Sequence, residues 1–178
     1  KDIISTYKKG TDFSIYMDTD GLIHAGSGLD QVTWMDVRVG DWVATPRHGK
    51  PVEINALWYN ALCTMDMLQA KFGDNDDSYR QLASLVKTSF NKRFWNENTV
   101  CLYDVVDEDD DTIRPNQIYA VSLPFTMLDK EREKAIVDTV MDKLYVGCGL
   151  RSLDPDHKDY HPIYIGSLSK RDHAYHQG

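Results

Sequence analysis

The chain has 178 residues, 42% of them hydrophobic, so it is long enough to bury one core. Its net charge of −8 argues against a nucleic-acid partner, which would need a basic face. The longest apolar runs are far too short to cross a bilayer, so no membrane partner is expected. The three cysteines are scattered and form no Cys-x-x-Cys pair. We interpret them as buried thiols in a reducing compartment, the cytoplasm.

Helical patterns cover much of the sequence. Residues 1–9 fit the end of a helix that Gly10 stops. Apolar residues recur at helical spacing from Pro51 to about Phe72, and Gly73 is a suitable stop. Further helices are predicted over residues 76–95 and 129–144, with a less regular candidate over 116–128.

Only one region has the pattern of a β-hairpin. Alternating apolar residues at positions 13–24, with Asp20-Gly21 between them, predict a short hairpin with a tight turn. Residues 107–111 form an acidic loop, and the chain becomes irregular after Gly147. With little other sign of strands, we expect an all-α fold in which helix pairs alternate with long polar and aromatic loops.

Residues 31–62 carry the most informative chemistry. They place the carboxylate of Asp36 beside Trp34, followed by a loop around Arg47 and a helix that begins with Glu53 in its first turn. That helix adds Asn55, Trp58, Tyr59 and Asn60. Sugars offer C–H patches that stack on aromatic rings and hydroxyls that need donors and acceptors in fixed positions. This ordered set therefore indicates sugar recognition.

Matching segments extend over nearly the whole chain. They are Thr33-Trp34-Met35-Asp36, Thr45-Pro46-Arg47, Val52 to Leu62, Arg114-Pro115-Asn116-Gln117, Gly149 to Leu153 and Arg171 to Gly178. In this order they closely resemble the amylo-α-1,6-glucosidase domain of glycogen debranching enzymes. The resemblance implies part of an (α/α)6 toroid of the six-hairpin glycosidase type. Residues 1–178 are then expected to be an incomplete portion of one glucosidase domain that continues beyond both termini, with other domains of the same parent chain as partners.

The resemblance also implies a reaction. The family releases the single α-1,6-linked glucose at a trimmed branch stub of glycogen or limit dextrin. Inverting hydrolysis needs two carboxyl groups roughly 6.5–9.5 Å apart, one as acid and one as base. By resemblance Asp36 is the general acid, and its place after Trp34 suits the partly apolar wall that such an acid needs. The base is expected after Gly178, so this chain alone should not hydrolyse substrate.

The same resemblance implies a set of substrate-binding residues. They are Trp34, Arg47, Glu53, Asn55, Tyr59, Arg114, Asn116, Gln117, Arg151, Asp172, Tyr175, His176 and Gln177. Asn55 and Tyr59 lie four apart on one helix face and are expected to point into the cleft together. Leu57 and Trp58 are expected in the core.

Several of these residues have a structural alternative. Asp36 fits a helix N-cap or a surface carboxylate, and Glu53 fits a cap of the helix after Pro51. Trp34 either stacks on glucose or only walls the pocket. Arg151 fits an ion pair as well as it fits ligand contact.

Metal and cofactor chemistry has weak support. His173 and His176 with Asp172 have ligand spacing for zinc but lack a further ligand pair, so we expect neither a metal nor a cofactor. The acidic stretches 18–21 and 107–111 do not reach the glutamate that closes a calcium loop. Two other functions stay open: a non-catalytic glucan-binding helical module, and an (α/α)6 α-glucosidase of another linkage.

Overall fold

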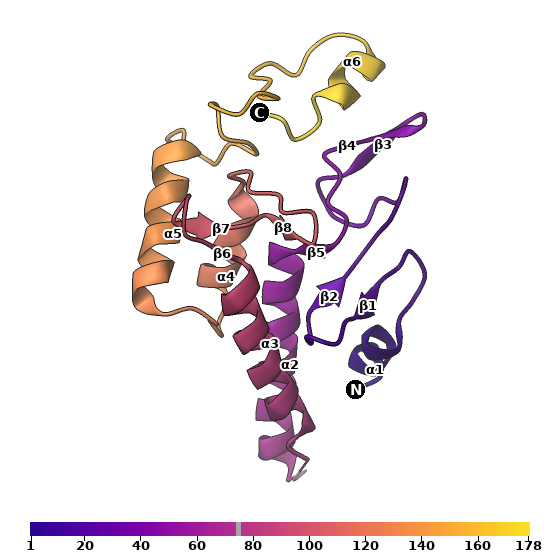
Figure 1. Ribbon diagram of the computed structural model, residues 1–178, viewed down its shortest axis with the longest axis vertical. Helices are drawn as coiled ribbons and strands as arrows, with labels where there is room; N and C mark the ends of the chain where they lie inside the picture. Colours follow the sequence, from indigo (N-terminus) through magenta and orange to yellow (C-terminus); the bar gives the residue numbers. More distant parts are fainter. Residues whose placement is uncertain (74–75) are drawn as a thin grey trace.

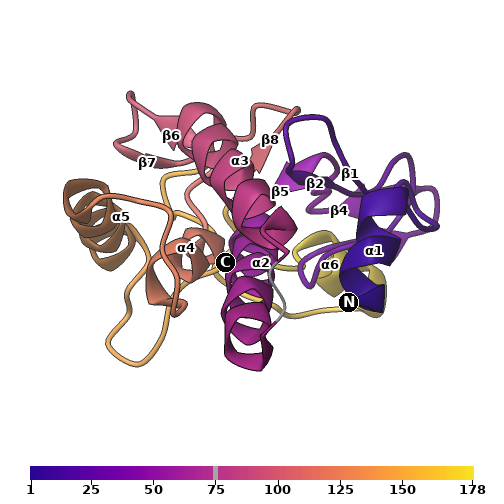
Figure 2. The same cartoon turned by 90° about the horizontal axis from the view of Figure 1, so that it is seen from below.

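The computed structural model describes residues 1–73 and 76–178 (Figure 1). Its helices are α1 (Asp2–Lys9), α2 (Val52–Phe72), α3 (Ser78–Arg93), the 3-10 helix η1 (Pro115–Ile118), α4 (Tyr119–Ser122), α5 (Lys130–Lys143) and α6 (Leu168–His173). Helices α2 and α3 pack side by side along the long axis of the molecule. Seen from below, they lie between α1 on one side and α4 and α5 on the other (Figure 2).

Short strands join these helices. They are β1 (Tyr16–Met17), β2 (Ile23–His24), β3 (Val37–Val39), β4 (Trp42–Ala44), β5 (Lys50–Pro51), β6 (Trp95–Asn96), β7 (Cys101–Leu102) and β8 (Val105–Val106). In the described part of the chain they form antiparallel pairs β1–β2, β3–β4, β5–β8 and β6–β7.

The predicted all-α fold, as part of an (α/α)6 toroid, is therefore wrong, because the chain is a mixed α/β structure. Strands of two or three residues hold too few side chains to show alternation in the sequence. Moreover, β5 and β8 pair Lys50 with Val106, so this sheet depends on a partner far along the chain.

The longer helices follow their predicted boundaries. Helix α2 starts after Pro51 and ends at Gly73, whose φ of 76° is left-handed, as a glycine stop requires. Helix α5 is capped by Asp129, whose carboxylate accepts a hydrogen bond from the Arg132 N–H at 2.8 Å. The candidate helix over 116–128 is only partly correct, because helical structure there ends at Ser122.

The predicted hairpin is confirmed by the pairing of β1 with β2. Its turn forms because Gly21 takes a φ of 82° and the Asp20 carboxylate accepts a hydrogen bond from the Leu22 N–H at 3.0 Å. The turn then packs under α2, where the Trp58 indole N–H donates to the Gly21 carbonyl at 3.0 Å.

The core lies between α2, α3, α5 and the β6–β7 pair. Its fully buried large side chains include Leu62, Phe90, Phe94, Leu102, Ile136 and Leu144. Trp58 is buried as predicted, whereas the prediction for Leu57 is wrong because this side chain is exposed. The prediction of buried thiols holds only for Cys101, since Cys63 is half-buried and Cys148 is exposed.

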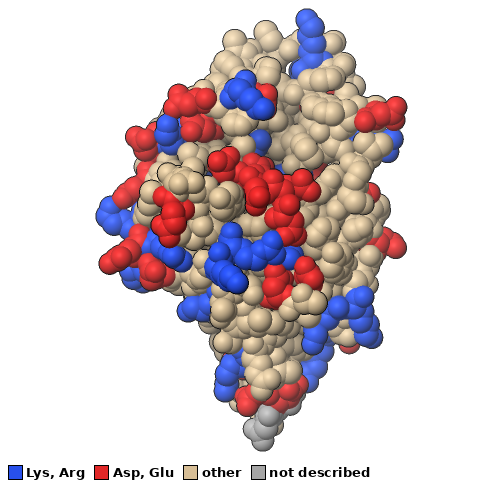
Figure 3. All heavy atoms as spheres, viewed as in Figure 1, with Lys and Arg blue, Asp and Glu red and all other residues tan. Residues whose placement is uncertain are grey.

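Charge on the surface is mixed in sign. On the face seen in Figure 3, acidic side chains gather over the middle of the molecule directly beside a basic group. Within the described residues, no helix combines the length and apolar character needed to cross a membrane.

Candidate active site

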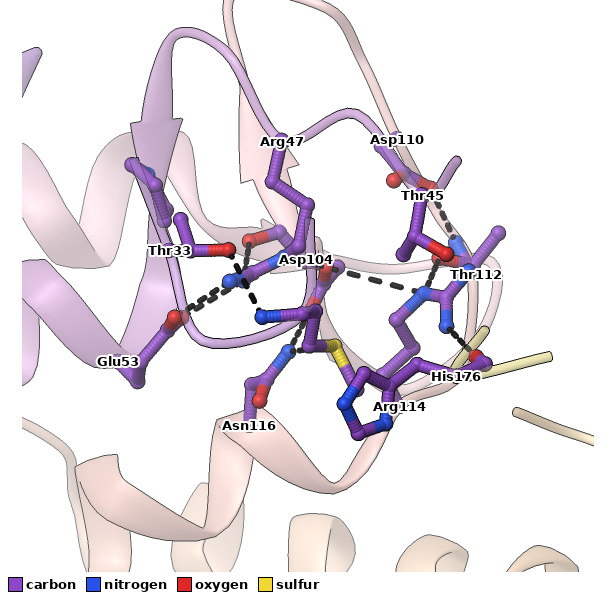
Figure 4. A network of polar contacts seen from close by, with 12 residues as sticks. Thr33, Thr45, Arg47, Glu53, Asp104, Asp110, Thr112, Arg114, Asn116 and His176 are labelled. Carbon is purple, nitrogen blue, oxygen red and sulfur yellow. Dashed lines mark hydrogen bonds and ion pairs between the residues drawn. The ribbon is translucent and has the colours of Figure 1, made fainter. Parts of the chain in front are cut away.

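Arg47 is the centre of a buried polar network that the β5–β8 pair assembles (Figure 4). Its Nε donates to Asp104 Oδ2 at 2.6 Å, and its Nη2 donates to Glu53 Oε2 at 2.6 Å. Its Nη1 also donates to the second oxygen of Glu53. All three side chains are almost fully buried. One planar guanidinium therefore binds both oxygens of one carboxylate and also reaches a second carboxylate, a planar fork geometry that lysine cannot supply.

The backbone around Arg47 explains how these groups meet. Pairing of Lys50 with Val106 sets β5 against β8. Arg47 precedes β5 and Glu53 follows it, so both lie close to Asp104, which directly precedes β8. This approach needs Gly49, which has a φ of 104° and whose Cβ, if present, would lie 2.7 Å from the Val106 carbonyl oxygen. The site is thus built on a strand pair rather than on a free loop.

Electrostatics make this network a rigid unit. Burial alone lowers the pKa of Arg47, but the charges of Asp104 and Glu53 outweigh it and raise the pKa above its ordinary value. Burial raises the pKa of Glu53, against the opposing effect of Arg47. Loss of one member leaves a buried charge without its partner, which is strongly unfavourable. Glu53 therefore serves the framework, and its contact with sugar stays a prediction.

Asn116 joins the buried network to an aromatic ring at the surface. Its Nδ2 donates to Asp104 Oδ1 at 2.8 Å, and its Oδ1 accepts a hydrogen bond from the Trp34 indole N–H at 3.0 Å. Trp34 is 51% exposed, and its ring meets the edge of the His176 ring at a centroid distance of 4.7 Å. A half-exposed indole held at two points offers a fixed apolar face to a ligand.

Asp36 follows Trp34 by two residues and is held by its own loop. Its Oδ2 accepts a hydrogen bond from the Val32 N–H at 2.9 Å, and its Oδ1 accepts one from the Thr33 N–H at 3.1 Å. The Thr33 hydroxyl also donates to Oδ1. Asp36 is only 8% exposed and is followed by β3, not by a helix. Both structural alternatives for this residue, an N-cap and a surface carboxylate, are therefore wrong.

The end of the chain closes over the network through Arg114. Its Nη1 donates to the carbonyls of Ser152 at 3.0 Å and His176 at 2.8 Å, and its Nη2 donates to Gln177 Oε1 at 3.3 Å. The Thr45 hydroxyl donates to the Tyr175 carbonyl at 2.8 Å. Segment 175–177 is consequently fixed against the loop that carries Arg47.

His176 is kept in its uncharged form by this setting. Burial lowers the pKa of the imidazole, and the nearby Arg114 charge lowers it further. At neutral pH the ring beside Trp34 is therefore neutral. Burial likewise lowers the pKa of Arg114.

The structure thus brings together most of the predicted site residues. They are Trp34, Asp36, Arg47, Glu53, Arg114, Asn116, Tyr175, His176 and Gln177.

Three predicted substrate residues have contacts outside this network, and their binding of substrate stays a prediction. The Asn55 amide exchanges hydrogen bonds with the backbone of Ile23, at 2.7 and 3.1 Å, and so fixes β2. Tyr59 lines a separate hollow with Cys63, and burial raises the pKa of Tyr59 to about 12. Gln117 accepts a hydrogen bond from the Leu102 N–H at 3.2 Å. The expectation that Asn55 and Tyr59 share a cleft is wrong, because their side chains have different surroundings.

The remaining two predicted residues also have contacts outside the network. The Arg151 Nε donates to the Tyr160 hydroxyl at 3.2 Å. Asp172 belongs to α6, which contacts β3. In the part of the chain that the structure describes, no three His, Cys, Asp or Glu side chains gather where they could hold a metal.

Asp104 is the central residue that sequence reasoning missed. It is a single carboxylate inside the apolar run Leu102-Tyr103-Asp104-Val105-Val106, and a charge at such a position is rarely buried without a partner. A lone carboxylate within an apolar run was therefore the sequence signal for a buried, paired Asp104. Its partners, Arg47 and Asn116, are too distant in sequence to suggest the pairing.

Comparisons with known proteins fit these observations. Residues 1–178 match the family described as Amylo-alpha-1,6-glucosidase. The chain is 28% identical over 219 residues to a protein named Glycogen debranching enzyme from Saccharomyces cerevisiae (strain ATCC 204508 / S288c). That alignment covers 96% of this chain but only 14% of the yeast protein, so the chain spans a small part of its relative's length. Because the match extends over the whole sequence, the chain belongs to the amylo-alpha-1,6-glucosidase family.

Proposed function

We propose that this chain is the part of a glycogen debranching glucosidase that binds the branch-stub glucose and supplies the general acid. The full-length protein would release glucose from α-1,6 branch stubs of glycogen or limit dextrin. The observation that carries the proposal is the half-exposed Trp34 ring, fixed by Asn116 and His176 in the same loop that holds the buried Asp36. Family membership over residues 1–178 supplies the substrate class.

In the proposed mechanism, Trp34 stacks on the terminal glucose and Asp36 protonates the glycosidic oxygen as the bond breaks. An inverting enzyme then needs a second carboxylate to activate water on the opposite face of the sugar. Glu53 and Asp104 are poor choices because both are bound to Arg47. We therefore place the base elsewhere in the full-length protein, and we expect this chain alone to release no glucose.

The proposed reaction also names the partners. The substrate is a branched α-glucan, and the other domains of the parent protein complete the site. Since glycogen is stored in the cytoplasm, the protein is proposed to work there.

One observation favours a second candidate, a non-catalytic glucan-binding module. Both oxygens of Asp36 accept hydrogen bonds from residues 32–33 of its own loop. A carboxylate held in this way is sufficient to shape the loop that presents Trp34 without donating a proton. The two candidates differ in whether the side chain must carry a proton.

Substitution Asp36→Asn in the full-length protein separates them. Asparagine keeps the shape but has no acidic proton, so glucose release from phosphorylase limit dextrin should fall by about two to four orders of magnitude. Glucan affinity should not change. The matched control is Asp138→Asn on α5, an exposed carboxylate that should leave the rate unaltered. Full activity of Asp36→Asn would rule out the acid role, and an inactive unmodified protein would favour the binding module.

A further inference from the structure

Trp42 is an exposed aromatic side chain that the proposed mechanism does not use. It lies on the hairpin β3–β4, which starts at Val37 directly after Asp36 and ends at Ala44 directly before Thr45. Both ends of this hairpin are therefore anchored in the site. Figure 1 shows the hairpin extending outward from the body of the molecule, next to α6.

The Trp42 ring is covered on one face. It stacks on the His173 ring of α6 at a centroid distance of 4.8 Å and an angle of 18°. The His173 Nδ1 in turn donates to the Ser169 carbonyl at 2.6 Å, which fixes the imidazole. Even so, Trp42 is 45% exposed. A side chain stacked on one face and exposed to this extent presents its other face to solvent.

Trp42 and Trp34 are held in the same way. His176 contacts Trp34 and His173 contacts Trp42, and the two histidines belong to one short segment. That segment is itself fixed through Arg114 and Thr45. One short segment of the chain thus positions two half-exposed indoles, one in the loop that carries Asp36 and one farther out on the hairpin.

We propose that Trp42 is an outer binding platform for the α-1,4-linked glucosyl units that lie beyond the branch-stub glucose. This inference rests on the proposed function. The stub glucose is terminal, so the rest of the glucan must extend away from it into solvent, and the hairpin also projects outward from the body of the molecule. The free face of Trp42 stacks on a sugar ring, and the exposed Asp41, the preceding residue on the same hairpin, offers a carboxylate for its hydroxyls.

The first test compares substrates with and without a glucan chain, using the full-length protein. Trp42→Ala should raise KM for limit dextrin about three- to tenfold, the loss expected for one aromatic contact, with kcat unchanged. Kinetics with α-glucosyl fluoride, which has no chain beyond the reacting glucose, should not change. Trp42→Tyr should restore most of the KM. Phe72→Ala, which removes another exposed ring at the far end of α2, is the matched control.

A binding measurement keeps this inference separate from the proposed function. Retardation in native gels that contain glycogen should weaken in Asp36→Asn/Trp42→Ala relative to Asp36→Asn alone. Failure of Asp36→Asn to reduce hydrolysis would defeat the proposed acid role and leave this binding result intact. An unchanged KM for limit dextrin, equal losses on both substrates, or no retardation of the parent protein would each overturn the role of Trp42.

Discussion

Two ionic clusters lie three residues apart on the chain and differ in their access to water. Around Arg47, the cation and the carboxylates of Glu53 and Asp104 are all at most 3% exposed. Around Lys50, only the ammonium is buried, at 2% exposure, while Asp18, Asp20 and Asp107 are 24–36% exposed. A carboxylate that keeps its contact with water can be resolvated after its partner is lost, whereas a fully buried one cannot. Burial, more than the number of ion pairs, should therefore decide what each substitution costs.

The Lys50 cluster also contains a second cation. Arg93 reaches Asp20 Oδ2 at 2.7 Å and pairs with Asp107 as well. The cluster joins the β1–β2 turn, β5 and α3, and it retains one cation if the other is removed. Among the described residues, the Arg47 cluster has no second cation within hydrogen-bond reach, since Arg114 approaches Asp104 only to 4.0 Å.

The largest effect is expected for Arg47→Met. It leaves two buried carboxylates without their guanidinium, so the free energy of unfolding should fall by about 3–5 kcal/mol in urea titrations. Arg38→Met is the matched control, because this exposed arginine reaches Asp41 only at 3.8 Å and should cost at most about 0.5 kcal/mol. A loss for Arg47→Met as small as that of the control would show that the buried cluster is not a stabilising unit.

A smaller effect is expected for Lys50→Met. Arg93 still pairs with Asp20 and Asp107, and all three carboxylates reach water, so the loss should be about 1–2 kcal/mol. The same urea titrations measure it. If Lys50→Met costs as much as Arg47→Met, then the exposure of the carboxylates does not control the outcome.

The smallest predicted effect is the pH dependence of the stability that the Lys50 cluster contributes. The Lys50 hydrogen bond lowers the pKa of Asp18 below its ordinary value of 3.8. Burial raises the pKa of Asp20, but hydrogen bonds from Lys50 and Arg93 lower it further than burial raises it. The unfolded chain then binds more protons than the folded protein in acid, so this stabilisation is complete above pH 3.8 and is lost as the pH falls through the folded pKa values.

The stability difference between the unmodified protein and Lys50→Met should accordingly shrink as the pH is lowered from about 5 to about 2.5. Urea titrations at a series of pH values measure this difference directly. A difference that stays constant or grows in acid would contradict the assigned pKa directions.

Local signals explain which parts of the fold were predictable. Helix α2 was bounded correctly because Pro51 and Gly73 act through their own backbone geometry. The β1–β2 hairpin was found because Asp20-Gly21 specifies its turn locally. The β5–β8 pair was not found, since neither strand is long enough to show a period and each depends on the other.

The candidate site was predictable as a set of segments but not residue by residue. Asn116 and Asn55 look alike in sequence, yet one anchors Trp34 and the other holds the backbone of Ile23. Asp104 belongs to none of the matching segments and still occupies the middle of the network.

The sequence alone determined the approximate boundaries of the longer helices, the first hairpin, the family and the segments that form the site. These follow from capping, periodicity and ordered motifs, all of which act over a few residues. The tertiary structure decided the mixed α/β class and the role of each polar side chain. Burial and partner choice arise where distant segments meet, as Arg47 meets Asp104, Asn116 meets Trp34 and Arg114 meets the backbone of residue 176. The free energy of a polar group depends on whether it is hydrogen-bonded to protein or hydrated. Its role is therefore decided only when the contacts between distant segments form.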